Sequence, residues 1–138
     1  GGSFSEEEII MFKKMGIEKR MIQMNVNDIK LASLYKFSQC FVFPSLYEGF
    51  GLPAIESMSF GAPTILSNSS SLPEVGGKDA LYIDPEEENT LINQIREVLS
   101  SNFNRVDYAK RATHWANQFS WEKMSDETVC TYEKILNP

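Results

Sequence analysis

Two glutamates and two glycines near the middle of the chain are the residues whose types and spacing could do chemistry. Glu48 and Glu56 are separated by seven residues, and Gly49 and Gly51 lie between them. A carboxylate can accept hydrogen bonds from two vicinal hydroxyls, as an acidic side chain does for ribose in dinucleotide-binding folds. Glycine lets another group approach the backbone closely. Residues of these types at this spacing could form a site for a phosphorylated ligand that carries hydroxyl groups.

A helix start should provide the phosphate-binding part of this site. Pro53 follows the glycines, and proline suits the first helical position because its missing N–H would be unpaired there. We predict a helix over residues 53–60 with Glu56 in its first turn. The free amides of residues 50–54 would then form a site for an anion. Ordinary explanations also exist, because many Gly-x-Gly pairs are only turns and glutamate is favourable in the first turn of any helix.

The elements that must position this segment alternate between helix and strand. The continuous apolar run at 40–43 is typical of a buried parallel strand, and ligands bind beyond the carboxyl ends of such strands. Ser5 and Glu8 have the spacing of a capping box at the first helix, and residues 68–79 resemble a polar loop. The predicted strands are 21–26, 40–43, 64–66 and 81–84, and the predicted helices are 5–15, 28–37, 53–60, 88–100, 106–118 and 121–136.

This alternation with short connections predicts an α/β fold, in which a parallel sheet has helices on both faces. We predict a single domain over residues 1–138, with C-terminal helices over about 105–136. Doubly wound sheets usually start on a strand, whereas this sequence opens on a helical pattern. We therefore expect the first strand region of the sheet to be missing.

The composition excludes several classes of protein. A formal net charge of −6 argues against a nucleic-acid-binding face, which needs clustered lysine and arginine. Cys40, Cys130 and the single histidine, His114, show neither a disulfide framework nor the ligand spacing of a zinc site. No apolar run approaches the roughly 18 residues of a membrane span, and no signal peptide is visible. We expect a cytoplasmic protein.

The segment FPSLYEGFGLPAIESMSFGAPTI, residues 43–65, resembles the signature of the retaining GT-B glycosyltransferases. This large family, the glycosyl transferases group 1, includes sucrose synthases and bacterial mannosyltransferases. Its signature places two glutamates seven residues apart around a Pro-Ser…Glu-Gly-Phe-Gly-Leu-Pro core, and Glu48 and Glu56 match it. The similarity covers roughly residues 21–136 and continues through 61–63, 71–75, 84–85 and 119–121. It implies the Rossmann-like C-terminal half of a GT-B fold.

The resemblance also implies roles for individual residues. Glu48 would contact hydroxyls of the donor sugar and stabilise positive charge that develops at the anomeric carbon. Glu56 would bind the ribose hydroxyls of the nucleotide. Other residues would surround the donor with backbone amides or from the strand end: Ser45, Tyr47, Gly49, Phe50, Gly51 and Leu52, with the backbone of Asn25 and Val26 beside the base.

The expected partner is a nucleotide-diphosphate sugar, and the expected reaction is transfer of the sugar to an acceptor with retention of anomeric configuration. No metal or other cofactor is expected, because helix amides and a basic residue neutralise the departing diphosphate in such enzymes. The resemblance further implies an N-terminal acceptor-binding domain, a glycine-rich turn after a first strand, and an arginine–lysine pair for the diphosphate. None of these is recognisable in the sequence.

We therefore expect the isolated chain to bind donor weakly and to transfer nothing by itself. The open sheet edge left by the missing strand would favour a homodimer, and association with the cytoplasmic membrane face would concern the parent protein only. Two alternatives stay open. A non-catalytic nucleotide-sugar-binding or regulatory domain of the same fold would bind its ligand without needing Glu48. An unrelated flavodoxin-like domain would need a carboxylate cluster after a first strand, which the sequence does not show.

Overall fold

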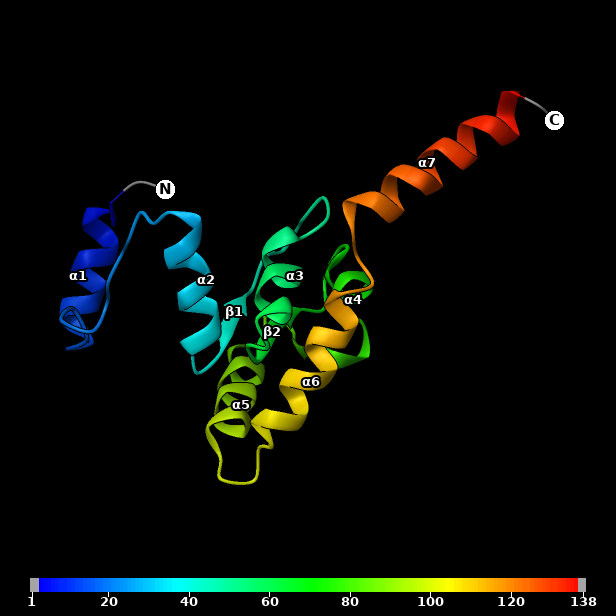
Figure 1. Cartoon of the computed structure of the whole chain (residues 1–138). Coiled ribbons are helices and arrows are strands. Elements are labelled where there is room, and N and C mark those ends of the chain that lie inside the picture. Colours follow the sequence, from blue (N-terminus) through cyan, green and yellow to red (C-terminus); the bar gives the residue numbers. More distant parts are fainter. Residues whose placement is uncertain (1–2, 137–138) are drawn as a thin grey trace. The chain divides into compact units, whose positions relative to one another are not determined.

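The computed structural model describes residues 3–136 (Figure 1). The chain forms two compact units, one that ends at Leu31 and one that begins at Ala32. Compact units of this kind can belong to one domain, so the single domain over residues 1–138 stays a prediction.

The first unit contains a helix with side-chain caps. Helix α1 spans Glu6–Lys14. Ser5 Oγ accepts a hydrogen bond from the Glu8 amide at 3.2 Å, and the Glu8 carboxylate accepts one from the Ser5 amide at 2.7 Å. The predicted capping box is therefore confirmed. Gly16, with φ +68°, follows the end of the helix.

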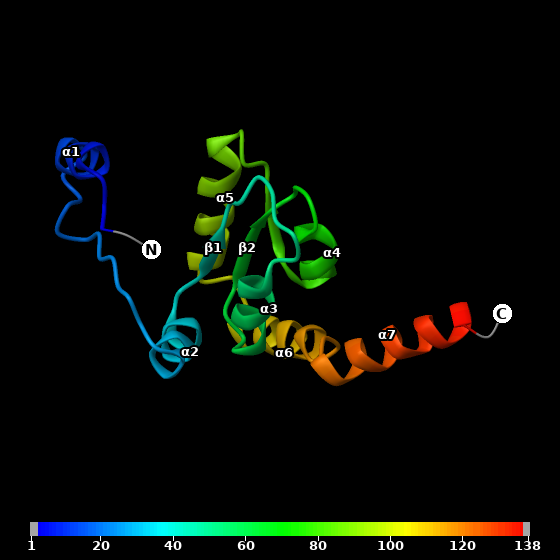
Figure 2. The same cartoon turned by 90° about the horizontal axis from the view of Figure 1, so that it is seen from above.

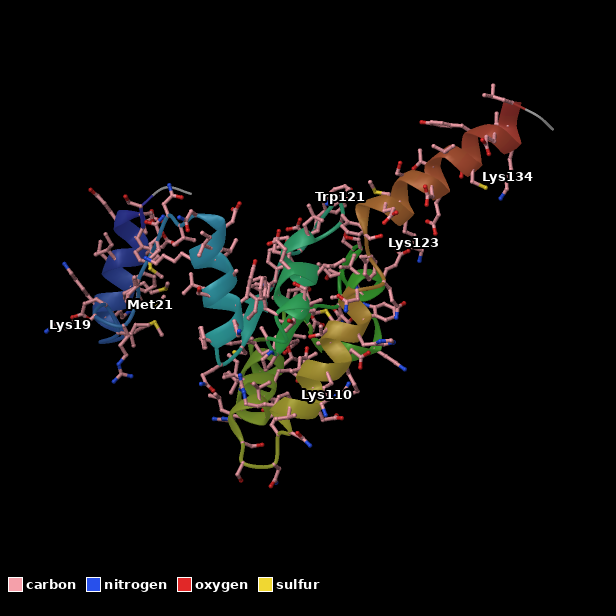
Figure 3. All side chains as sticks on the ribbon, viewed as in Figure 1. Lys19, Met21, Lys110, Trp121, Lys123 and Lys134 are labelled. Carbon is pink, nitrogen blue, oxygen red and sulfur yellow. The ribbon has the colours of Figure 1, made fainter. Side chains whose placement is uncertain are left out.

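The strand predicted at residues 21–26 is wrong. These residues belong to no strand or helix, and Met21, which Figure 3 labels, is 39% exposed. The prediction relied on the apolar residues of the segment. A strand, however, exists only when a neighbour pairs with its N–H and C=O groups, and no strand in the described residues does so.

The second unit contains a parallel sheet. In the described residues it has three strands, β1 (Phe41–Phe43), β2 (Thr64–Ser67) and β3 (Leu81–Ile83), in the order β1-β2-β3. Every residue of the central strand β2 is buried, as expected of a parallel strand that is covered on both faces.

The helices that follow α1 are α2 (Asp28–Phe37), α3 (Leu52–Ser59), α4 (Leu72–Gly76), α5 (Glu88–Leu99), α6 (Arg105–Ala116) and α7 (Trp121–Leu136), with a short 3₁₀ turn η1 at Gly77–Asp79. The stretch predicted as a polar loop at 68–79 thus contains α4 and η1. The local serines and glycines concealed this helix, whose Leu72 and Val75 face the core. No residue of α7 is buried, and Figure 3 shows Trp121, Lys123 and Lys134 along it.

Helices cover both faces of the sheet (Figure 2). Leu66 of β2 packs in one core with Met58 of α3 and Ala112 of α6. Ile65, the preceding residue of β2, packs on the other face with Val98 of α5. The two faces follow from the alternation of side chains along a strand. The predicted α/β fold is therefore confirmed.

Buried hydrogen bonds attach α3 and α6 to β2. The Thr64 amide donates to the hydroxyl of Tyr108 at 3.0 Å, and Thr64 Oγ1 lies 2.8 Å from Ser57 Oγ. Ser57 Oγ also donates to the carbonyl of Ala54 at 2.8 Å. Because buried polar groups are costly without partners, the contact with Ser57 holds α3 against the sheet and the bond to Tyr108 holds α6.

Candidate functional site

The candidate site lies where β1 and β2 end. The β1 loop (residues 44–51) connects β1 to α3, and the β2 loop (residues 68–71) connects β2 to α4 (Figure 2). Neighbouring parallel strands have their carboxyl ends at the same edge of the sheet, which is where open α/β sheets bind ligands. The two loops are therefore placed to contact each other.

Serine hydroxyls of the β2 loop bind the backbone of the β1 loop. Ser70 Oγ donates to the Glu48 carbonyl at 2.9 Å, and Ser71 Oγ lies within hydrogen-bond distance of the carbonyls of Glu48 and Phe50, at 3.2 and 3.0 Å. The Glu48 amide donates to Ser70 Oγ over 3.4 Å. Ser70 has φ +54°, which is uncommon for a residue other than glycine. These contacts fix the carbonyls of the β1 loop toward the β2 loop.

The start of the β1 loop is held in the same way. Ser67, the last residue of β2, donates its hydroxyl to the Ser45 carbonyl. The Ser45 hydroxyl donates to the carbonyl of Tyr47 at 3.1 Å. In this structure Ser45 therefore stabilises the loop, and its contact with a donor stays a prediction.

Amides at the end of the β1 loop and at the first residue of α3 are left without partners. In the part of the chain that the structure describes, no acceptor binds the N–H groups of Gly49, Phe50, Gly51 or Leu52. The Ala54 amide, predicted to be free, instead donates to the Gly51 carbonyl at 2.9 Å. The helix begins at Leu52 with no side-chain cap. Because the four free amides lie at the positive end of α3, they can receive an anion.

The two glycines of the loop have different constraints. Gly51 is buried, has φ +100° and would place a Cβ only 2.7 Å from Leu72 Cδ2. A Cβ on Gly49 would meet nothing within 4 Å, and its φ is not positive. Gly51 is therefore required by the fold itself, whereas at Gly49 the fold leaves open space in which another molecule could approach the backbone.

Glu48 lies in the β1 loop and is half-buried. Its backbone is bonded to Ser70 and Ser71, but its carboxylate has no hydrogen-bond or ion-pair partner among residues 3–136. A held backbone with an unpaired carboxylate suits a residue that binds a ligand, and its catalytic role stays a prediction.

Glu56 is the fifth residue of α3, so its predicted place in the first helical turn is wrong. The helix begins one residue earlier than predicted, because Leu52 adopts helical geometry ahead of Pro53. The Tyr35 hydroxyl donates to Glu56 Oε2 at 3.2 Å. Burial first, then the charge of Glu56 and the hydrogen bond to it, raise the pKa of Tyr35 to about 12.

The large apolar side chains of the β1 loop and of the first residue of α3 are exposed. Tyr47 is 83% exposed, and Phe50 and Leu52 are 45% and 47% exposed. The Phe50 ring meets Phe119 edge-on at a centroid distance of 6.1 Å, and Phe119 meets Trp115 at 5.9 Å. The segment between α6 and α7 therefore supports the loop through aromatic contacts.

Sequence reasoning missed the residues that hold this site together. Ser70 and Ser71 were predicted only as part of a polar loop, and no role in the site was predicted for Tyr35 or Phe119. A signal was available for the serines, because a polar run after one parallel strand must lie beside the loop after its neighbour. Nothing local marks Tyr35 as the partner of Glu56.

For two of the expected residues, the place beside the base of the nucleotide stays a prediction. Asn25 and Val26 belong to the unit that ends at Leu31, whereas residues 45–56 belong to the other. Among residues 3–136, no group of three or more histidine, cysteine, aspartate or glutamate side chains is arranged to hold a metal ion. No helix within this range combines the length and apolarity needed to cross a membrane.

Comparison with known proteins decides the family. The family described as Glycosyl transferases group 1 matches residues 1–115, which is most of the chain. The chain belongs to this family. The site just described, with two glutamates around the glycines of the β1 loop, lies within the matched residues.

Two bacterial relatives are mannosyltransferases by name. The O-antigen chain mannosyltransferase B of Escherichia coli is 41% identical over 110 residues, which are 80% of this chain and 29% of that protein. The MMP alpha-(1->4)-mannosyltransferase of Mycolicibacterium hassiacum is 33% identical over 135 residues, 86% of this chain and 32% of that protein. The chain thus spans about a third of the length of these relatives.

A solved structure confirms the fold. The sucrose-phosphate synthase of Thermosynechococcus elongatus superposes with a TM-score of 0.80 at 25% identity, over 95% of this chain and 34% of that one. This neighbour is a GT-B enzyme, so the group 1 chain described here has part of a GT-B fold.

Proposed function

We propose that this chain is the part of a glycosyltransferase that binds a nucleotide-diphosphate sugar, whose sugar passes to an acceptor with retention of anomeric configuration. The observation that carries the proposal is the start of α3. The unpaired amides of Gly49, Phe50, Gly51 and Leu52 lie there, whereas the carbonyls of Glu48 and Phe50 are bonded to serine hydroxyls. Among the helices of residues 3–136, α3 is also the one without an acidic residue in its first turn. A diphosphate would therefore meet donors and no opposing carboxylate there.

The two glutamates extend this anion site into a site for a nucleotide sugar. Glu56 would accept the ribose hydroxyls, and Glu48 would accept hydroxyls of the sugar. When the bond between the anomeric carbon and the diphosphate breaks, its electron pair stays with the diphosphate, where the amides stabilise the negative charge. The carboxylate of Glu48 would stabilise the positive charge at the anomeric carbon. Because both bacterial relatives are named mannosyltransferases, mannose is the sugar to test first.

Calorimetric titration of the chain with UDP, GDP and ADP tests the proposal. We expect one diphosphate to bind, and we expect Glu56→Ala to weaken it about tenfold or more. Glu48→Ala should leave the free diphosphate nearly unaffected but weaken the matching nucleotide mannose. Glu97→Ala is the control, because Glu97 is an exposed residue of α5 on the opposite face of the sheet.

Two results would count against the proposal. Failure of all three diphosphates to bind at millimolar concentration contradicts donor binding by this chain. Binding of nucleotide mannose that is indifferent to Glu48→Ala favours the non-catalytic domain instead.

A further inference from the structure

The contact between Tyr35 and Glu56 joins two helices at the candidate site. The Tyr35 hydroxyl lies 3.2 Å from Glu56 Oε2, and the two residues are 21 positions apart in the chain. Tyr35 is only 6% exposed. Its ring meets Phe41 edge-on at 5.2 Å and lies nearly parallel to Phe60 at 6.2 Å. The phenol is therefore held by packing on both sides, whereas the carboxylate that it contacts belongs to an exposed residue.

The Tyr35 phenol is suited to be a fixed hydrogen-bond donor, and the Glu56 carboxylate is the acceptor that it orients. With a pKa of about 12, the Tyr35 phenol keeps its proton at neutral pH and can donate. A free glutamate samples several rotamers and loses that freedom when it binds a ligand. A carboxylate can accept about four hydrogen bonds, and among residues 3–136 Oε1 of Glu56 has no partner. Tyr35 thus restrains the Glu56 carboxylate and leaves it able to accept further hydrogen bonds from hydroxyl groups.

We propose that Tyr35 is a positioning residue that holds the Glu56 carboxylate in the orientation that accepts the two ribose hydroxyls of a nucleoside diphosphate. This inference rests on the proposed function and adds a residue to it. Tyr35 itself touches Glu56 and not the ligand. Its effect is preorganisation, because the carboxylate is ordered before the nucleotide arrives.

The test compares ribonucleotides with analogues that lack the hydroxyls. Tyr35→Phe keeps the ring and removes only the donor. We expect it to weaken whichever of UDP, GDP and ADP binds by roughly threefold to tenfold, and to leave the 2′,3′-dideoxy form of that nucleotide within about twofold. Tyr108→Phe is the matched control, since Tyr108 loses a buried hydroxyl that bonds to Thr64 and not to the site. It should change neither affinity by more than about twofold.

A second variant shows whether the effect passes through Glu56. In a Glu56→Gln background, Tyr35→Phe should cost the ribonucleotide less than about twofold, because the charged group that Tyr35 orients is already gone. Equal weakening of the ribo and dideoxy forms would mean that Tyr35 only supports the fold. Unchanged affinity of a folded Tyr35→Phe protein would likewise overturn the proposal.

A measurement without ligand tests the proposal even if the Tyr35→Phe protein does not fold. In Glu56→Gln the neighbouring charge is absent, so the pKa of the Tyr35 phenol, followed by NMR of its ring carbon, should be lower than in the unsubstituted chain. An unmoved pKa would show that the contact does not form in solution. If no nucleotide binds the unsubstituted chain, the proposed function fails and the positioning role falls with it. If nucleotides bind and only Tyr35→Phe is silent, the positioning role alone is rejected.

Discussion

The starts of α3 and α6 show two ways in which a helix can satisfy its first turn. At α6, Asn104 Oδ1 accepts a hydrogen bond from the Asp107 amide at 3.0 Å, and Asp107 itself places a negative charge in the first turn. At α3, the residue before the helix is Gly51, which has no side chain to accept, and the first turn holds no acid. The chain therefore supplies a side-chain acceptor to the first turn of α6, whereas the Leu52 amide at the start of α3 has no acceptor among the described residues.

The difference also extends to what precedes each helix. The β1 loop before α3 is held through its carbonyls by Ser70 and Ser71, so the amides of Gly49, Phe50 and Gly51 are the groups that remain available. α4 and α5 also lack side-chain caps, but each has a glutamate in its first turn. An open helix start on a well-anchored loop is what preorganised anion binding requires.

Gly51→Ala should have the largest effect. The added methyl group would lie 2.7 Å from Leu72 Cδ2 on a residue with φ +100°, so strain and overpacking should lower the free energy of unfolding by about 2–4 kcal/mol. Urea unfolding followed by circular dichroism measures this change. A loss below about 1 kcal/mol would show that the start of α3 is less constrained than the structure indicates.

Ser71→Ala should have an intermediate effect that separates the two helix starts. Losing the hydroxyl that serves the carbonyls of Glu48 and Phe50 should cost about 1 kcal/mol of unfolding free energy. Asn104→Ala, the matched control at α6, should also cost about 1 kcal/mol. We expect only Ser71→Ala to weaken the bound nucleoside diphosphate in calorimetry. If Ser71→Ala and Asn104→Ala bind the nucleoside diphosphate with the same affinity, the anchoring of the β1 loop does not contribute to binding.

Gly49→Ala should have the smallest effect on stability. Its Cβ would point into open space, so the free energy of unfolding should change by less than about 0.5 kcal/mol. If the diphosphate approaches this backbone, the methyl group should nevertheless weaken its binding by about threefold or more. A variant that is stable and binds normally would remove Gly49 from the site and confine the anion contacts to the amides that follow it.

Much of the fold was predictable because local patterns carry it. The apolar runs at 40–43 and 64–66 became β1 and β2, and the capping box of Ser5 and Glu8 formed as its spacing indicates. The place of the site, at the end of a parallel strand, followed from the same alternation. The prediction of a strand at residues 21–26 was wrong because an apolar segment forms a strand only when a neighbouring strand pairs with it.

The sequence by itself determined the kind of fold, the family signature around Glu48 and Glu56, and the glycines before α3, because each depends on residues close together in the chain. Only the tertiary structure decided that Gly51 is required by Leu72 while Gly49 is not. It also decided that Ser70 and Ser71 turn the carbonyls of the β1 loop away from its free amides, and that Tyr35 reaches Glu56. These contacts join residues about 20 positions apart, and their geometry is set by how β1, β2 and the helices pack, which no local pattern encodes.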